Sequence, residues 1–154
     1  MSSITLLFTA LLIYVVAAFA SLCVRRNEQL SINLAGVGGI LGGVLGILAC
    51  IPALIGSEPI LATFTTPFDF AQFSVRMDGL AAFMVLVISL LTIITSLYSF
   101  AYVAEYKGKG AGTMGFFMNI FIASMVALVT CDNAFYFLVF FEMMSLASYF
   151  LVLT

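Results

Sequence analysis

Charged residues divide this chain into long uncharged runs. There are five such runs, and only the last is interrupted, by a single carboxyl at Glu142. A helix needs about 20 mostly apolar residues to cross the hydrocarbon core of a bilayer, and in lipid its backbone groups must be paired within the segment. The pattern therefore predicts five transmembrane helices, at residues 3–24, 31–55, 79–103, 112–131 and 134–154.

The composition supports an all-α integral membrane protein with one membrane domain spanning residues 1–154. Of the 154 residues, 64% are hydrophobic and 8% charged, which is too little charge for a water-soluble domain and too much apolar surface for a disordered chain. The net charge of −2 offers no basic surface for nucleic acid. With no histidine and three scattered cysteines, the usual metal and cluster ligands are missing. We therefore expect this chain to bind no metal or cofactor and to hold no catalytic site.

The basic residues predict an orientation. Arg25 and Arg26 follow the first predicted helix, and Lys107 and Lys109 follow the third. Because basic residues collect in cytoplasmic loops, these two connections are predicted to face the cytoplasm, with the N-terminus outside.

The segment 56–78 differs from the other connections. Residues 60–66 and 73–77 are rich in strand-forming side chains, and Pro67-Phe68-Asp69 is a turn signal between them. We expect a short β-hairpin on the outer side, between the second and third helices. It could dock against a neighbouring subunit or lie on the membrane surface through its phenylalanines.

Glycine recurs along the second predicted helix. Small residues recur every four positions in two interleaved series. The glycines of these series are Gly38, Gly39, Gly42, Gly43 and Gly46. Small residues at this spacing let a second helix approach closely. We interpret them as helix-packing positions.

Glu142 is the one acidic residue predicted within the membrane. An ionised carboxyl at the centre of a membrane helix costs roughly 2.5–3.5 kcal/mol on insertion scales, so it must be protonated, paired or in a hydrated cavity. Ser145 and Tyr149 follow at i+3 and i+7 and share its helix face. The pattern predicts a proton-transfer site formed by these three residues, and the alternative is a protonated Glu142 that hydrogen-bonds a neighbouring helix and only stabilises packing. Polar side chains of the third and fourth helices could contribute to such a site: Thr92, Thr95, Ser96, Ser99, Asn119 and Ser124.

Four segments carry a resemblance to a known family. They are residues 76–91, 96–99, 114–119 and 132–145, and the last contains the run Phe-Glu-Met-Met-Ser around Glu142. The sequence resembles the antiporter-like membrane subunits of respiratory complex I and of membrane-bound hydrogenases, in particular those of formate hydrogenlyase-type complexes. In that family the glutamate of the fifth helix belongs to the proton-translocation path, and Glu142 matches it.

The resemblance also implies the setting of the chain. Family members lie in the bacterial inner membrane beside other membrane subunits, and the nickel–iron and iron–sulfur centres are on partner subunits. They are longer than this chain and carry lysines on later helices, so the five helices correspond to an incomplete portion of a larger antiporter-like fold. The expected function is proton translocation and energy coupling without catalysis in this chain. A structural membrane anchor without transport and a Na⁺/H⁺ antiporter-type subunit are the alternatives.

Overall fold

The chain forms five long helices and a pair of short strands. We describe its fold from a computed structural model, which describes residues 3–56, 60–64, 67, 73–106 and 108–153. The elements are α1 (Ser3–Cys23), α2 (Glu28–Ile55), β1 (Ile60–Phe64), β2 (Phe73–Met77), α3 (Gly79–Tyr102), the 3₁₀ turn η2 (Val103–Tyr106), α4 (Ala111–Thr130) and α5 (Ala134–Leu153). All five α-helices are long and apolar enough to span a membrane, as the charge pattern predicts.

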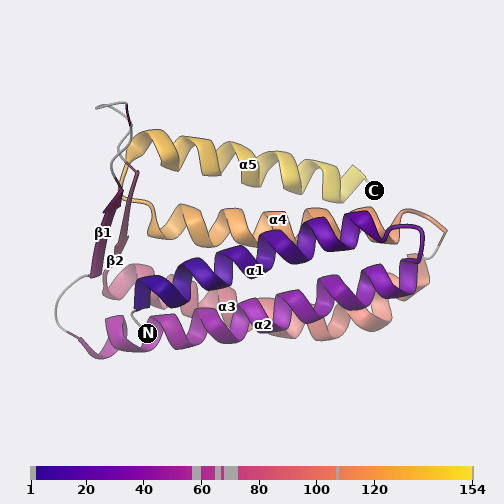
Figure 1. Cartoon of the computed structure of the whole chain (residues 1–154), viewed down its shortest axis with the longest axis horizontal. Helices are drawn as coiled ribbons and strands as arrows, with labels where there is room; N and C mark the ends of the chain where they lie inside the picture. The colour runs from indigo at the N-terminus through magenta and orange to yellow at the C-terminus, as the bar shows by residue number, and fades with distance from the viewer. Residues whose placement is uncertain (1–2, 57–59, 65–66, 68–72, 107, 154) are drawn as a thin grey trace.

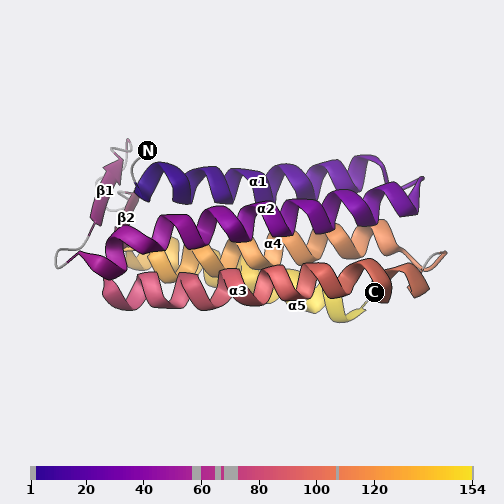
Figure 2. The same ribbon diagram turned by 90° about the horizontal axis from the view of Figure 1, so that it is seen from below.

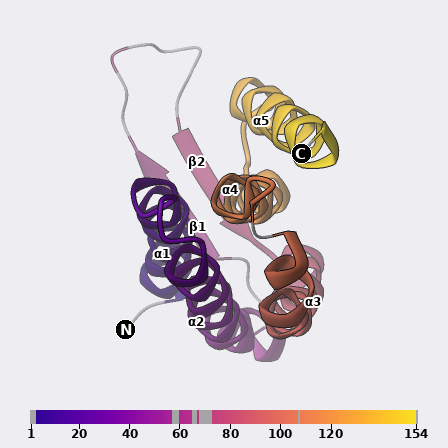
Figure 3. The ribbon, with the colours of Figure 1, turned by 90° about the vertical axis from the view of Figure 1, so that its right-hand side faces the viewer.

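The helices run side by side along the long axis of the molecule (Figure 1), and α1 and α2 remain adjacent when the view is turned (Figure 2). Viewed end-on, α1, α2 and α3 follow one another along an arc, with α4 on its concave side and α5 beyond α4 (Figure 3). Helix α4 contacts the other four helices, whereas α5 packs mainly against α4.

Two connections meet at each end of this bundle. At one end, the backbone N–H of Gly108, after α3, donates to Glu28 at the start of α2 over 2.6 Å. At the other end, the N–H of Asp132, between α4 and α5, donates to the carbonyl of Ser74 in β2 over 3.0 Å. The α1–α2 and α3–α4 connections therefore share one end, as expected for five helices that alternate in direction.

Side-chain caps fix two helix starts. Asn27 accepts from the N–H of Leu30, so α2 begins at Glu28, one turn before the predicted start at residue 31. Asp78 accepts from the N–H of Ala81 at the start of α3 and lies 3.8 Å from Arg76. The remaining predicted helix bounds differ from the structure by one residue at most.

The two strands lie between α2 and α3, in the segment 56–78. They pair antiparallel, with Ile60 opposite Met77 and Phe64 opposite Phe73. Val75 also forms an isolated bridge to Cys131 after α4, so β2 is bonded on both of its edges. The turn predicted at residues 67–69 lies largely outside the described residues.

The glycines of α2 lie on two faces of that helix. A Cβ at Gly38 would overlap the Cβ of Ala17, and one at Gly42 would lie 2.5–2.9 Å from ring atoms of Tyr14, so both glycines face α1. A Cβ at Gly39 or Gly43 would instead meet residues of α3. Gly46 also faces α3, where a Cβ would overlap the hydroxyl of Ser89.

Two sets of hydrogen bonds join helices inside the bundle. Asn119 on α4 donates to the carbonyl of Ala35 on α2 over 3.3 Å. Near the end with the α1–α2 connection, Ser31 donates to the carbonyl of Ser21, and Ser21 donates to the carbonyl of Gly112. Interhelical hydrogen bonds of this kind fix the register of helices that have no hydrophobic driving force between them in lipid.

Candidate functional site

Glu142 lies near the middle of α5. It is the ninth of the 20 residues of that helix, so it lies about 12 Å along the axis from the start of α5, at 1.5 Å per residue. This is the place along the helix that the predicted bounds of residues 134–154 give it. The side chain is exposed in this chain.

The exposure of Glu142 follows from the face of α5 on which it lies. The face toward α4 contains Ala147, the one residue of α5 classed as buried, together with Phe140 and Leu151, which line cavities shared with α4. With 3.6 residues per turn, Glu142 is rotated from these three residues by about 140–180°. The carboxyl therefore lies on the face of α5 that points away from α4.

Ser145 and Tyr149 lie on the same outer face of α5. Both are exposed, Tyr149 to 59%. Among the described residues, neither forms a hydrogen bond with Glu142. Apolar side chains lie on the same face before and after these three residues. The whole set is spaced alternately by three and four positions and consists of Phe135, Leu138, Glu142, Ser145, Tyr149 and Val152. We call this set the outer seam. Such spacing is that of a seam between packed helices.

The polar residues of α3 and α4 do not gather around the carboxyl, contrary to our expectation. Thr92, Thr95 and Ser99 donate to carbonyls of their own helix. Asn119 points toward α2, and Ser124 donates to Ile120. The reason is that Glu142 is directed away from α4, so these side chains satisfy their donors within the bundle of α1–α4 instead.

Ser96 is directed toward α2. Its hydroxyl lies against Gly39 of α2, where a side chain on the glycine would overlap it.

The basic residues of the sequence are Arg25, Arg26, Arg76, Lys107 and Lys109. Over the described ranges, none of the five α-helices contains a basic residue that could balance Glu142. In the part of the chain that the structure describes, no group of three or more His, Cys, Asp or Glu could hold a metal ion. Within the described residues, Glu142 therefore has neither a counter-charge nor a metal ion to pair with.

Tyr14 is a central residue of the bundle that the sequence pattern does not single out. It is the twelfth residue of the 21 in α1 and only 1% exposed, with its ring against Gly42. A tyrosine in the middle of a membrane helix places a hydroxyl in the apolar core, and that was the signal available in the sequence. Its neighbour across the helix interface could not be known from the sequence.

Comparison with known proteins shows what the chain is similar to. Over 153 residues, 99% of the chain, the sequence is 54% identical to Hydrogenase-4 component B of Escherichia coli (strain K12). The match covers 23% of that protein, so the chain spans about a quarter of the length of this relative. No family model matches the chain. The motifs around Glu142 pointed to this same component, and the similarity is confirmed. The helices and the similarity together make the chain a multi-pass membrane protein.

Proposed function

We propose that this chain is part of a non-catalytic membrane subunit of a hydrogenase complex in the bacterial inner membrane, and that Glu142 takes part in proton translocation there. The similarity to Hydrogenase-4 component B supports the assignment to such a complex. Other membrane subunits of that complex are the proposed partners. The nickel–iron and iron–sulfur centres are then proposed to lie on partner subunits, because such centres are held by sets of Cys thiolates and this sequence has three scattered cysteines.

The observation that carries the proposal is the place of Glu142 on the outer seam. A carboxyl near the centre of a membrane helix, facing lipid, is costly, and the same residue facing further helices becomes a proton-binding group at membrane depth. Ser145 and Tyr149 beside it supply hydroxyls to the same face. We infer that the outer seam packs against helices that supply a cation or ordered water opposite Glu142.

The test is the substitution Glu142→Gln, which keeps the size of the side chain and removes its titration. The assembled complex is reconstituted into vesicles, and hydrogen evolution and internal pH are recorded together. We expect proton translocation to slow by about a hundredfold or more, as when a positioned proton-transferring group is lost. Hydrogen evolution from an artificial low-potential electron donor should continue.

A matched control is Glu105→Gln, which removes an exposed carboxyl in η2 outside the helices. It should leave both measurements unchanged. If Glu142→Gln leaves proton movement intact in a fully assembled complex, the chain acts as an anchor and the proposal is wrong. Dependence of the wild-type transport on Na⁺ would instead indicate a Na⁺/H⁺ antiporter-type subunit.

A further inference from the structure

One face of α2 consists of small residues and is met by polar side chains from three other helices. Its positions lie within about 80° of one another at 3.6 residues per turn, and they are Ser31, Ala35, Gly39, Gly42 and Gly46. We call this set the inner face of α2. It extends about 22 Å along the helix at 1.5 Å per residue. Helix α2 lies between α1 and α3, with α4 on the concave side of the arc (Figure 3).

Two serines of α3 are directed at the inner face. A side chain on Gly39 would overlap the hydroxyl of Ser96, and one on Gly46 would overlap the hydroxyl of Ser89. Both serines are 0% exposed, and neither hydroxyl has a hydrogen-bond partner among the described residues. The remaining serine and threonine hydroxyls of α3 each donate to a carbonyl of their own helix. The two unpaired hydroxyls of α3 are therefore the two that point at α2.

Tyr14 and Asn119 bring two further polar groups to the inner face. The ring of Tyr14 from α1 lies against Gly42, and its hydroxyl approaches Thr92 of α3 without reaching hydrogen-bond geometry. Asn119 of α4 donates to the carbonyl of Ala35, while its Oδ1 accepts no hydrogen bond from any residue that the structure describes. Both side chains are at most 1% exposed.

These unpaired oxygens lie at the middle of the bundle, where they are costly. A buried hydroxyl or amide oxygen without a partner loses its hydration and gains nothing in return. Helix α2 cannot supply side-chain partners, because the positions that face these oxygens are alanine and glycine. Ordered water is the ligand that such groups retain inside proteins, and each water needs two to four polar partners.

The polar row reaches one end of the bundle and stops before the other. At the end with the α1–α2 connection, Ser31 and Ser21 hydrogen-bond to each other, and Ser21 also donates to α4. One turn beyond the inner face in the other direction, Cys50 belongs to a cluster of buried apolar side chains that includes Leu7 and Val85. The row therefore runs from the first end to the middle of the bundle.

We propose that the inner face of α2 is a hydration site, where ordered water molecules hydrogen-bond to Ser89, Ser96, Tyr14 and the Oδ1 of Asn119. Hydroxyls can donate to or accept from a water, whereas Oδ1 only accepts. Ser89 and Ser96 lie about 10 Å apart along α3, so more than one water molecule is required. The site is separate from Glu142, which points away from the bundle, and does not depend on the proposed function.

X-ray radiolytic labelling tests for this water. Hydroxyl radicals formed from a bound water oxidise the side chains beside it, even where bulk water has no access. The full chain in lipid nanodiscs is irradiated briefly, and oxidation of Tyr14 is measured by mass spectrometry relative to its rate in the unfolded chain. Leu7 is the matched control, because it is on the same helix, is 0% exposed and lies two turns away, toward the end that the polar row does not reach.

We expect Tyr14 to be oxidised several-fold faster than Leu7 on this scale. The double variant Ser89→Ala, Ser96→Ala removes two of the hydroxyls that hold the water, so it should reduce oxidation of Tyr14 to the level of Leu7. Ser99→Ala is the control for the substitutions, since its hydroxyl is already paired within α3. It should leave oxidation of Tyr14 unchanged.

Thermal unfolding of the double variant gives a second measurement. If water pairs the two serines, alanine removes hydrogen bonds and lowers the unfolding temperature, whereas alanine in place of unpaired hydroxyls raises it. Oxidation of Tyr14 no faster than that of Leu7 would overturn the proposal, and so would a double variant more stable than the wild type. If the double variant does not fold, the comparison of Tyr14 with Leu7 in the wild type decides.

Discussion

Single glycines determine how closely the helices of this bundle approach. Gly38 leaves room for the Cβ of Ala17 on α1, and Gly42 leaves room for the ring of Tyr14. Both positions require glycine, because a methyl group added to either residue would overlap an atom of α1. Dispersion between closely packed backbones is then a main source of helix association in lipid.

The substitution Gly38→Ala should destabilise the chain by about 1–3 kcal/mol, because overpacking of a well-packed contact costs this much. Ala17 has no rotamer by which to move away. Gly79→Ala is the control, since no atom lies within 4 Å of its added methyl. Reversible unfolding in mixed micelles measures both variants. Equal stability of the two would show that the α1–α2 contact is looser than described.

The sequence predicts that these glycines pack helices, but not which helix each one meets. The spacing places Gly38, Gly42 and Gly46 in one series. Each step of four residues turns the helix by about 40°, so Gly46 is rotated by about 80° from Gly38 and faces α3 with Gly39. Which helix packs on each face of α2 depends on the tertiary fold, and a repeat within one helix carries no information about that fold.

At the scale of elements, α5 differs from the other helices in how little of it is covered. Ala147, 3% exposed, is its one residue classed as buried, whereas α2 has twelve such residues. Hydropathy and length were sufficient to predict that α5 is a helix and that Glu142 lies at its centre. They could not predict which side of α5 meets α4, because this helix is apolar over most of its surface and its one polar stripe, of Glu142, Ser145 and Tyr149, could face either α4 or other helices.

The substitution Ala147→Leu should loosen α5 from α4, because the larger side chain does not fit the contact that alanine makes. Amide hydrogen exchange in detergent micelles measures the effect helix by helix. We expect exchange in α5 to become about tenfold faster, as for a local loss of 1–2 kcal/mol, with α2 unchanged. Leu146→Ala alters an exposed neighbour and should have no such effect. Exchange in α5 as slow as in α2, in the unmodified chain, would contradict this description.

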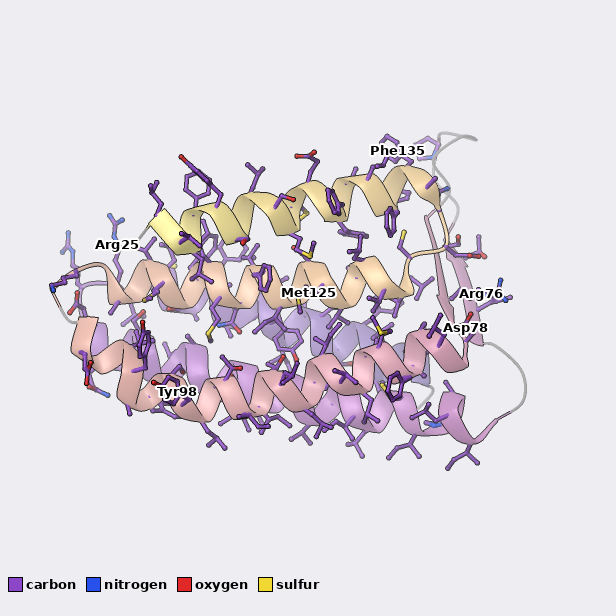
Figure 4. All side chains as sticks on the ribbon, turned by 180° about the vertical axis from the view of Figure 1, so that it is seen from behind. Arg25, Arg76, Asp78, Tyr98, Met125 and Phe135 are labelled. Carbon is purple, nitrogen blue, oxygen red and sulfur yellow. The ribbon has the colours of Figure 1, made fainter. Side chains whose placement is uncertain are left out.

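At the scale of the whole molecule, the two ends differ in charge. The end with the α1–α2 and α3–α4 connections has Arg25, Arg26 and Lys109 against Glu28 and Glu105 among its described residues. The opposite end, labelled at Arg76 and Asp78 in Figure 4, also has Asp132. Among the described residues the first end is net positive and the second net negative, so the positive-inside rule predicts that the first end faces the cytoplasm.

Thiol labelling tests this orientation. With Cys50 and Cys131 replaced by alanine, Cys23 remains as an exposed thiol at the predicted cytoplasmic end. A membrane-impermeant maleimide should label it only after the cells are permeabilised. A second variant that also carries Cys23→Ala and Pro67→Cys should be labelled in intact cells, because residue 67 lies between the two strands at the other end. The reverse pattern would invert the predicted topology.

The attachment of α5 through α4 also bears on biogenesis. Helices α1 to α4 have most of their contacts with one another, so they can associate as soon as they leave the translocon. The fifth helix then enters the bilayer with a carboxyl on its uncovered side, at a cost of roughly 2.5–3.5 kcal/mol. Release of this helix into lipid is therefore the step of membrane insertion with the highest free-energy cost. It is also the step that depends most on a neighbouring helix being already in place.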